Sequence, residues 1–416
     1  MWLEKKMKIV VDTNMVSPHT APLSLELAKL CGRENVAYAV HELAQDPFRT
    51  SAVHDLVHDI LYDPTTTPAS FEKLIEEADL VMESRRDFDL MESRVVRNKP
   101  TYYISERWFK PIDILHLSDA EHARGCGLWF SGFWRMLLPF GWRRARKIYH
   151  LLTQEGDFLY LPVGIRAARD MARLCGLLHG DYKCLFHAPE LDFERRPLGR
   201  IWLKNGQDEK LYCLDKMRMW GYYVSSSKTD LSTVCAANNG NQNVVKVLWV
   251  GRLLSWKRVD TIVRAVGELS NLKCNDDSIP TITLDIYGDG PEKGRLQDMA
   301  RKYGQAIRFY PSIQYAEVRR VMRAHDVYVL SSNSFEGWGA VVSEALEEGM
   351  KVIGTYEAGS SATILPEENL FHAGDWKALK TMLENGVADV GIGKWTASYA
   401  AQALISHISG RENLNA

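Results

Sequence analysis

The sequence predicts an α/β protein built from two doubly wound domains. Strand-like and helix-like segments alternate along both halves of the chain, and each strand candidate is a short, nearly continuous apolar run of the buried parallel type. Between the halves, residues 225–243 are rich in Ser, Thr, Asn and Gly and show little periodicity. A chain of 416 residues is also long for one hydrophobic core. We therefore assign 1–222 and 244–392 to two domains, joined by a linker over 223–243.

Helical patterns separate the strand candidates, as a parallel sheet with crossover connections requires. The first strand candidate is Lys8–Asp12, and Gly32 closes the helical pattern that follows it. The remaining strand candidates are Val36–Val40, Leu80–Met82, Thr101–Ser105, Lys246–Val250, Thr283–Tyr287, Val327–Leu330 and Lys351–Gly354. A final helical pattern within 395–416 is expected to pack back on the first domain.

The bulk composition is that of an ordinary globular protein, with 46% hydrophobic residues, 25% charged residues and a formal net charge of −2. This near-neutral balance argues against nucleic acid as a partner. Seven scattered cysteines without a CxxC pair indicate reduced thiols rather than disulfides or a zinc site. The N-terminus lacks the apolar region of a signal peptide, so we expect a cytoplasmic protein.

Glycines and charged residues gather where strands of the second domain are predicted to end. Ligands of doubly wound sheets bind beyond the carboxyl ends of the strands. Arg and Lys supply positive charge to a phosphate there, and glycines let backbone N–H groups approach it. The residues are Gly251, Arg252 and Lys257 after Lys246–Val250, then Gly288, Asp289 and Gly290, then Gly337, Trp338 and Gly339. Each loop alone is weak evidence, because Gly-x-Gly is more often a tight turn, and Asp289 is an ordinary turn residue.

Three stretches of this domain, GRLLSWKRVDTIVRA, IYGDGPEKGRL and SFEGWGAVVSEALEEGMKVIGTYEAGS, resemble the donor half of the retaining glycosyltransferases of family 4, which have the GT-B fold. The most specific feature is the spacing of Glu336 and Glu344. The match covers nearly all of 246–375 in order. Arg258 departs from it, since the family usually has glycine there. The resemblance implies two Rossmann-like domains facing across a cleft.

The resemblance also implies roles in binding a nucleotide sugar. Arg252 and Lys257 would hold the donor diphosphate, where positive charge stabilises the leaving group. Glu336 would face the sugar, and Glu344 would accept hydrogen bonds from the ribose hydroxyls. Glu344 could instead be a solvated helix residue, as Glu347 and Glu348 are expected to be. The remaining expected donor contacts are Gly251, Gly288, Asp289, Gly290, Gly337, Trp338 and Gly339, with backbone at Ser312 and Ile313 for the base.

The first domain is expected to take the acceptor. Its stretch NMVSPHTAPLSLELAKL resembles a subgroup of the family that acts in bacterial surface polysaccharide and lipopolysaccharide assembly. His19 would contact the transferring sugar or the acceptor hydroxyl, as a hydrogen-bond partner or base. The alternative is a loop histidine that caps local backbone. After Thr101–Ser105, Glu106 or Arg107 would line the cleft, unless they form a structural ion pair.

Residues 127–147, GLWFSGFWRMLLPFGWRRARK, combine aromatic bulk with a basic end. The apolar part is too short and too polar for a confident transmembrane helix. Two interpretations stay open. The segment could lie at the interface with anionic lipid, which suits a lipid-linked acceptor at the inner face of the plasma membrane. It could instead be an aromatic helix in the core with a solvated basic end.

The function predicted is a retaining glycosyltransferase that moves a sugar from a nucleotide sugar, with UDP or GDP favoured, to a glycan or lipid-linked acceptor. Glu336, His19 and Glu106 are the candidate catalytic residues. No cofactor and no obligatory metal are predicted, because no Asp-x-Asp follows a strand at a plausible position. Two alternatives stay open: a GT-B sugar-nucleotide epimerase, and a non-catalytic sugar-nucleotide-binding or membrane scaffold subunit.

Overall fold

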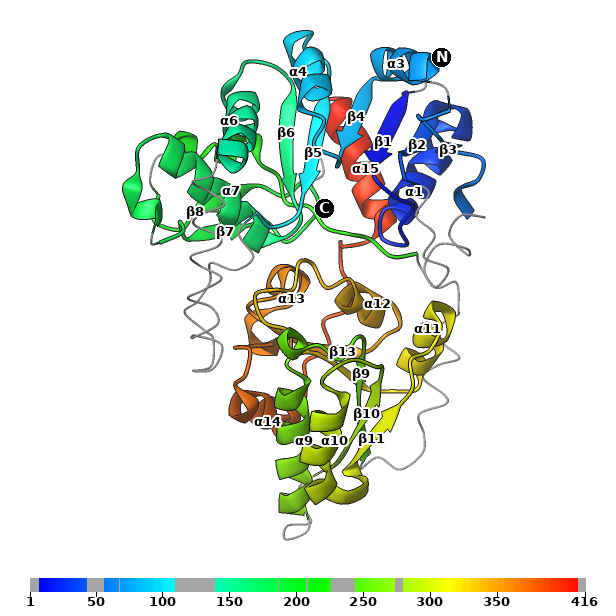
Figure 1. Cartoon of the computed structure of the whole chain (residues 1–416), viewed down its shortest axis with the longest axis vertical. Coiled ribbons are helices and arrows are strands. Elements are labelled where there is room, and N and C mark those ends of the chain that lie inside the picture. The colour runs from blue at the N-terminus through cyan, green and yellow to red at the C-terminus, as the bar shows by residue number, and fades with distance from the viewer. Residues whose placement is uncertain are drawn as a thin grey trace. The chain divides into compact units, whose positions relative to one another are not determined.

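The computed structural model describes residues 7–42, 56–66, 68–108, 139–185, 187–206, 209–225, 244–273 and 280–410. The described residues form two compact units. The first runs to Ser225 and takes in the chain again from Lys394, and the second holds the residues between. Figure 1 shows a sheet flanked by helices in each unit.

The first unit is built on a six-stranded parallel sheet with the order β3-β2-β1-β4-β5-β6. Its central strand β1 has the sequence IVVDT and is buried along its whole length, as an apolar run in a parallel sheet should be. The strands are β1 (Ile9–Thr13), β2 (Val36–Val40), β3 (Leu61–Tyr62), β4 (Leu80–Glu83), β5 (Thr101–Ser105) and β6 (Phe158–Pro162). A separate antiparallel pair joins β7 (Leu191–Phe193) to β8 (Ile201–Leu203).

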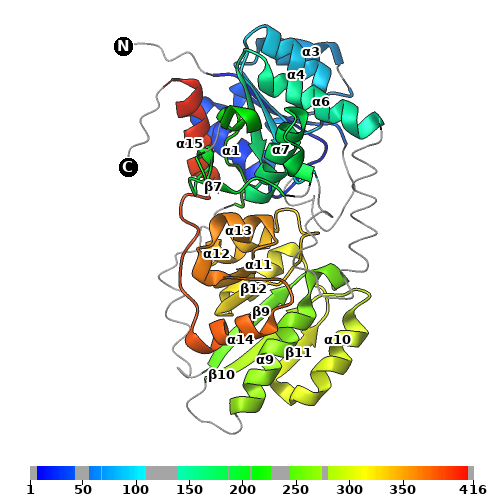
Figure 2. The same ribbon diagram turned by 90° about the vertical axis from the view of Figure 1, so that its left-hand side faces the viewer.

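The crossover helices of this unit are α1 (Ala21–Cys31), α3 (Pro68–Glu77), α4 (Phe88–Val96), α6 (Pro139–Thr153) and α7 (Ile165–Leu178). The C-terminal helix α15 (Ala397–Ile408) lies beside α1 in both views (Figures 1 and 2). Small residues make this close approach possible, since Ala400, Ala401 and Ala403 are buried on its packed side. The chain end thus belongs to the first unit.

The second unit repeats the architecture with the order β11-β10-β9-β12-β13-β14, again all parallel. Its strands are β9 (Val244–Val250), β10 (Thr281–Tyr287), β11 (Ile307–Tyr310), β12 (Val327–Leu330), β13 (Lys351–Thr355) and β14 (Leu370–Phe371). Its helices are α9 (Val259–Lys273), α10 (Lys293–Ala300), α11 (Tyr315–Arg323), α12 (Val341–Glu347), α13 (Gly359–Ile364) and α14 (Trp376–Asn385). Alternate residues of β12 point to opposite faces of the sheet, and Val327 and Val329 pack in the core with residues of α9. The helices α10 and α14 lie next to α9.

Two sequence expectations fall wholly or partly outside the described residues. Of the predicted linker 223–243, the structure describes only the residues up to Ser225. Of the aromatic segment 127–147, residues 127–138 lie outside, and the rest forms the start of α6. Within the described residues, no helix is long and apolar enough to cross a membrane.

Candidate functional site

An ion pair joins two loops at the carboxyl end of the second sheet. Lys257 ends a single 3-10 turn, Ser255–Lys257, after β9, and its ammonium contacts the carboxylate of Glu336 in the loop after β12. Their side chains are only 19% and 11% exposed, so the pair is screened less than a surface pair. The Ser332 hydroxyl donates to the same Glu336 oxygen at 2.8 Å.

Hydrogen bonds between the two loops position this pair. The Ser331 hydroxyl donates to the carbonyl of Lys257 at 2.7 Å, and the Asn333 N–H donates to the carbonyl of Trp256 at 2.9 Å. Thr355, at the end of β13, donates in turn to the carbonyl of Ser332 at 2.6 Å. Three strand ends therefore hold the Lys257 and Glu336 loops in one place.

The second glutamate of the motif lies inside α12. Glu344 is 6% exposed, so it is not the solvated residue of the alternative reading. Burial and the Glu344 carboxylate together raise the pKa of the nearby Tyr315 hydroxyl. The expectation that Glu348 is solvated is wrong: it is 3% exposed and paired with Arg319 and with Arg323, because α11 packs against α12.

The glycines of the first two loops serve close backbone packing. A Cβ on Gly288 would lie 1.9 Å from the carbonyl oxygen of Gly251, and one on Gly290 would lie 2.4 Å from that of Leu253. Asp289 accepts hydrogen bonds from the N–H of Gly290 at 2.7 Å and from Lys293 at 3.1 Å. Its carboxylate therefore stabilises its own turn, as the plainer reading of Gly-Asp-Gly holds.

The loop after β12 is anchored by its own tryptophan. Trp338 is 3% exposed, and its carbonyl accepts from the N–H of Ser360 at 2.7 Å. Gly337 approaches Gly359 closely, since a Cβ on Gly359 would lie 2.5 Å from the Gly337 oxygen. Gly339 has a φ of +81°, which favours glycine. The burial of Trp338 gives it a structural role in holding this loop, whereas the sequence predicted that it contacts the donor.

The other expected donor residues lie at the same edge of the sheet. Arg252 is exposed, and no hydrogen bond or ion pair ties its side chain to the described part of the chain. Ser312 is exposed and Ile313 half-buried in the loop between β11 and α11. Arg258 sits in the left-handed region with a φ of +49°, so it occupies the backbone conformation for which the family uses glycine.

In the first unit, a tyrosine that sequence reasoning missed lies between two predicted residues. The ring of Tyr222 stacks at 6.4 Å, centroid to centroid, on that of His19. Its hydroxyl is hydrogen-bonded to Glu106, and burial and that carboxylate raise its pKa. The segment holding Tyr222 is fixed alongside β6, where the N–H of Trp220 donates to the carbonyl of Pro162 at 3.1 Å.

Both backbone polar groups of His19 are hydrogen-bonded. Its N–H donates to the Ser17 hydroxyl at 3.2 Å, and its carbonyl accepts from the N–H of Tyr223 at 3.2 Å. Arg107 instead forms the structural ion pair of the alternative reading: it is buried and bonded to both oxygens of Asp170, at 3.2 and 3.3 Å.

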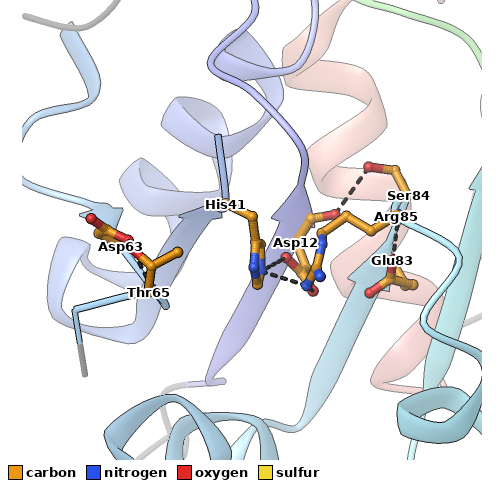
Figure 3. A network of polar contacts seen from close by, with 7 residues as sticks. All are labelled: Asp12, His41, Asp63, Thr65, Glu83, Ser84 and Arg85. Carbon is orange, nitrogen blue, oxygen red and sulfur yellow. Dashed lines mark hydrogen bonds and ion pairs between the residues drawn. The ribbon is translucent and has the colours of Figure 1, made fainter. Parts of the chain in front are cut away.

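A polar network missed by sequence reasoning lies where β2, β1 and β4 end (Figure 3). The fully buried Asp12 lies 2.9 Å from His41 Nε2 and pairs with Arg85 at 3.3 Å. Glu83 lies opposite Asp12 in the register of β1 and β4. Burial and the Asp12 charge raise the pKa of Glu83 well above its ordinary value. Among the described residues, no cluster of His, Cys, Asp and Glu could hold a metal ion.

The chain is similar in sequence to known glycosyltransferases. The family model described as glycosyl transferases group 1 matches residues 236–389, which hold the Lys257 and Glu336 loops. The chain is 32% identical over 108 residues to the UDP-N-acetylglucosamine–peptide N-acetylglucosaminyltransferase GtfA subunit of Streptococcus agalactiae, covering 26% of this chain and 20% of that protein. It is 27% identical over 165 residues to the lipopolysaccharide core biosynthesis glycosyltransferase LpsE of Rhizobium meliloti, covering 39% of this chain and 45% of LpsE. The chain thus spans less than half the length of these curated relatives.

Solved structures show the fold. The lipopolysaccharide outer core galactosyltransferase WaaB in its apo form matches 97% of this chain and 100% of its own, with a TM-score of 0.56 and 13% identity. The Anabaena protein HepE in complex with UDP matches 97% of both chains, with a TM-score of 0.51 and 17% identity. The chain therefore has the GT-B fold of these structures, and its second unit carries the group 1 sequence signature.

Proposed function

We propose that this protein is a retaining glycosyltransferase that transfers a sugar from a nucleotide sugar to a glycan or lipid-linked acceptor in bacterial surface polysaccharide assembly. The single observation that carries the proposal is the partly buried Lys257–Glu336 pair at the strand ends of a domain that matches glycosyl transferases group 1. A UDP sugar is the first donor to test, because HepE was solved with UDP and the GtfA relatives are named for UDP-N-acetylglucosamine.

In the proposed step, the bond between the anomeric carbon and the diphosphate oxygen breaks, and the acceptor oxygen bonds to the same face of that carbon. The acceptor proton passes to the departing diphosphate, which leaves as the nucleoside diphosphate. Lys257 and the exposed Arg252 stabilise the negative charge that grows on it. Glu336 orients the sugar hydroxyls, and Glu344 holds the ribose.

Donor binding tests the proposal directly. Melting temperatures are measured with UDP-, GDP-, ADP- and TDP-sugars, and at least one is expected to raise the melting temperature, with the UDP sugars first. A shift with none of them overturns the proposal. Donor that isomerises without an acceptor indicates an epimerase instead, and donor that binds without turnover on any acceptor extract indicates a scaffold. The anomeric configuration of a purified product, read by NMR, tests retention.

The His19–Tyr222–Glu106 group is proposed to contact the acceptor side of the reaction. Its chemistry fits hydrogen bonding to a sugar hydroxyl, since an imidazole, a phenol and a carboxylate lie next to one another. Tyr222→Phe removes the hydrogen bond to Glu106 and keeps the ring on His19. An acceptor KM that rises while the donor KM stays constant supports this assignment, and unchanged values for both refute it.

A further inference from the structure

A basic pocket of about 630 Å³ opens in the first unit, whereas the donor loops belong to the second unit. Five of its lining residues are cations: Arg85, Arg86, Arg143, Arg144 and Lys147. None of the described residues that line it is acidic. We propose that this pocket binds a phosphate or diphosphate group of the acceptor. Only the statement that the phosphate belongs to an acceptor rests on the proposed function. The pocket's affinity for a phosphate group is tested without any transfer reaction.

The cations come from two separate elements and converge on one concavity. Arg85 and Arg86 follow β4, and Asn14, which follows β1, also lines the pocket. Arg143, Arg144 and Lys147 lie in α6, where Arg143 and Lys147 are one turn apart. The pocket therefore lies beyond the carboxyl ends of the central strands, where sheets of this type bind ligands.

Three of the cations are held by neighbours. Arg85 is fixed by Asp12 at 3.3 Å and contacts His41 at 2.6 Å (Figure 3). Arg86 lies over the Trp108 ring at 5.8 Å, and Lys147 pairs with Asp89 at 2.8 Å. The buried Asp12 sets the position of Arg85 before a ligand arrives, which lowers the entropy cost of binding.

The other two cations carry charge that the described residues do not neutralise. Arg143 and Arg144 are exposed, and no ion pair or hydrogen bond ties their side chains to the described part of the chain. A solvated helix face could explain them if they stood alone. Here they face Arg85 and Arg86 from another element, and like charges gathered in one concavity repel one another. A bound anion removes that repulsion.

The arginine content selects the chemistry of the anion. Four of the five cations are arginines, whose planar fork matches phosphate oxygens in bidentate geometry, whereas lysine acts as a point charge. A single phosphate or a diphosphate satisfies several such forks at once. The same group is carried by a phosphorylated glycan and by a lipid-linked diphosphate, and the experiment below separates these two sources.

The test measures pyrophosphate binding by calorimetry on the full chain with UDP held at saturation, so that the proposed donor site is filled. Arg143→Glu and Arg144→Glu are each expected to weaken pyrophosphate at least tenfold, since a charge-assisted bond is lost and a repulsion gained. Arg146→Glu is the matched control: it reverses one exposed charge on α6 outside the pocket, and should leave the affinity nearly unchanged. Thermal melts verify that all three variants fold.

The results divide cleanly. Loss of pyrophosphate affinity in the two pocket variants alone supports the site, whereas equal affinity in all variants, or no binding at all by the wild-type chain, overturns it. The nucleotide-sugar panel is measured in parallel: if none of its members binds, the proposed function fails while the pocket is still judged on pyrophosphate alone. Sedimentation with phosphatidylglycerol and phosphatidylcholine vesicles shows which molecule carries the phosphate group. Pocket-dependent binding to the anionic vesicles supports a lipid-linked group, and pyrophosphate binding without vesicle binding supports a phosphorylated glycan.

Discussion

Lys257 and Glu336 form an ion pair although 79 positions separate them in the chain. The pair exists because β9 and β12 are neighbours in the second sheet and both end at the same edge. Each residue satisfies the charge of the other. In the proposed reaction, part of that pairing is exchanged for contacts to diphosphate and sugar, which makes the pair the most informative place to perturb.

Glu336→Gln is expected to separate binding from turnover. The amide oxygen still accepts from Ser332, but the neutral amide no longer neutralises the Lys257 ammonium. The affinity for UDP should therefore equal or exceed that of the wild-type chain. Transfer should fall by about 100-fold or more if the carboxylate acts on the sugar in the transition state. Calorimetry with UDP and initial-rate kinetics give the two values. A variant with normal turnover would remove Glu336 from the reaction.

Glu344→Gln is expected to weaken UDP by roughly tenfold or more, because the buried carboxylate is the proposed acceptor for two ribose hydroxyls. The matched ligand is 2′,3′-dideoxy-UDP, which offers no diol. Its affinity should be the same for the wild-type chain and the variant. Equal weakening of both ligands would mean that the substitution disturbs α12 rather than a ribose contact.

Gly288→Ala is expected to destabilise the second unit by about 1–3 kcal/mol, because the added Cβ must displace the Gly251 carbonyl 1.9 Å away. Gly294→Ala is the control. Gly294 lies in α10 with nothing within 4 Å of its added Cβ, so alanine should stabilise the helix by about 0.5–1 kcal/mol. Chemical denaturation of both variants gives the difference, and similar midpoints would contradict the close packing of the two loops.

Glu83 makes the stability of the first unit depend on pH. Its pKa is raised in the folded chain by burial and by Asp12, so the native state keeps a proton that the unfolded chain releases. The free energy of unfolding should therefore fall as the pH rises from the ordinary glutamate range through the raised value. Glu83→Gln should remove this decline, because the amide keeps a donor toward Asp12 at every pH.

Denaturation midpoints from pH 5 to pH 8 measure the effect. Glu72→Gln replaces an exposed residue of α3 and serves as the control. Its free energy of unfolding should decline with rising pH as that of the wild-type chain does. A Glu83→Gln variant with the wild-type slope would show that the proton is not held at Glu83.

Much of the fold follows from local patterns. Val36–Val40, Thr101–Ser105 and Val327–Leu330 are strands with the predicted bounds, because each is an apolar run with polar residues at its ends. Gly32 ends α1 with a φ of +92°, as its position predicts. By contrast, β3 and β14 have two residues each, too short to leave a pattern, and β6 and β11 were not predicted as strands.

The sequence by itself determined the two parallel sheets and the local chemistry of the donor loops, because short apolar runs, glycines and charged residues stand next to one another in the chain there. Only the tertiary structure decided that Tyr222 lies between His19 and Glu106, that Asp12 meets His41 and Arg85, and that Arg86 and Arg144 line one pocket. Strand order and register create those contacts, since they bring together side chains from distant segments whose spacing in the chain carries no period.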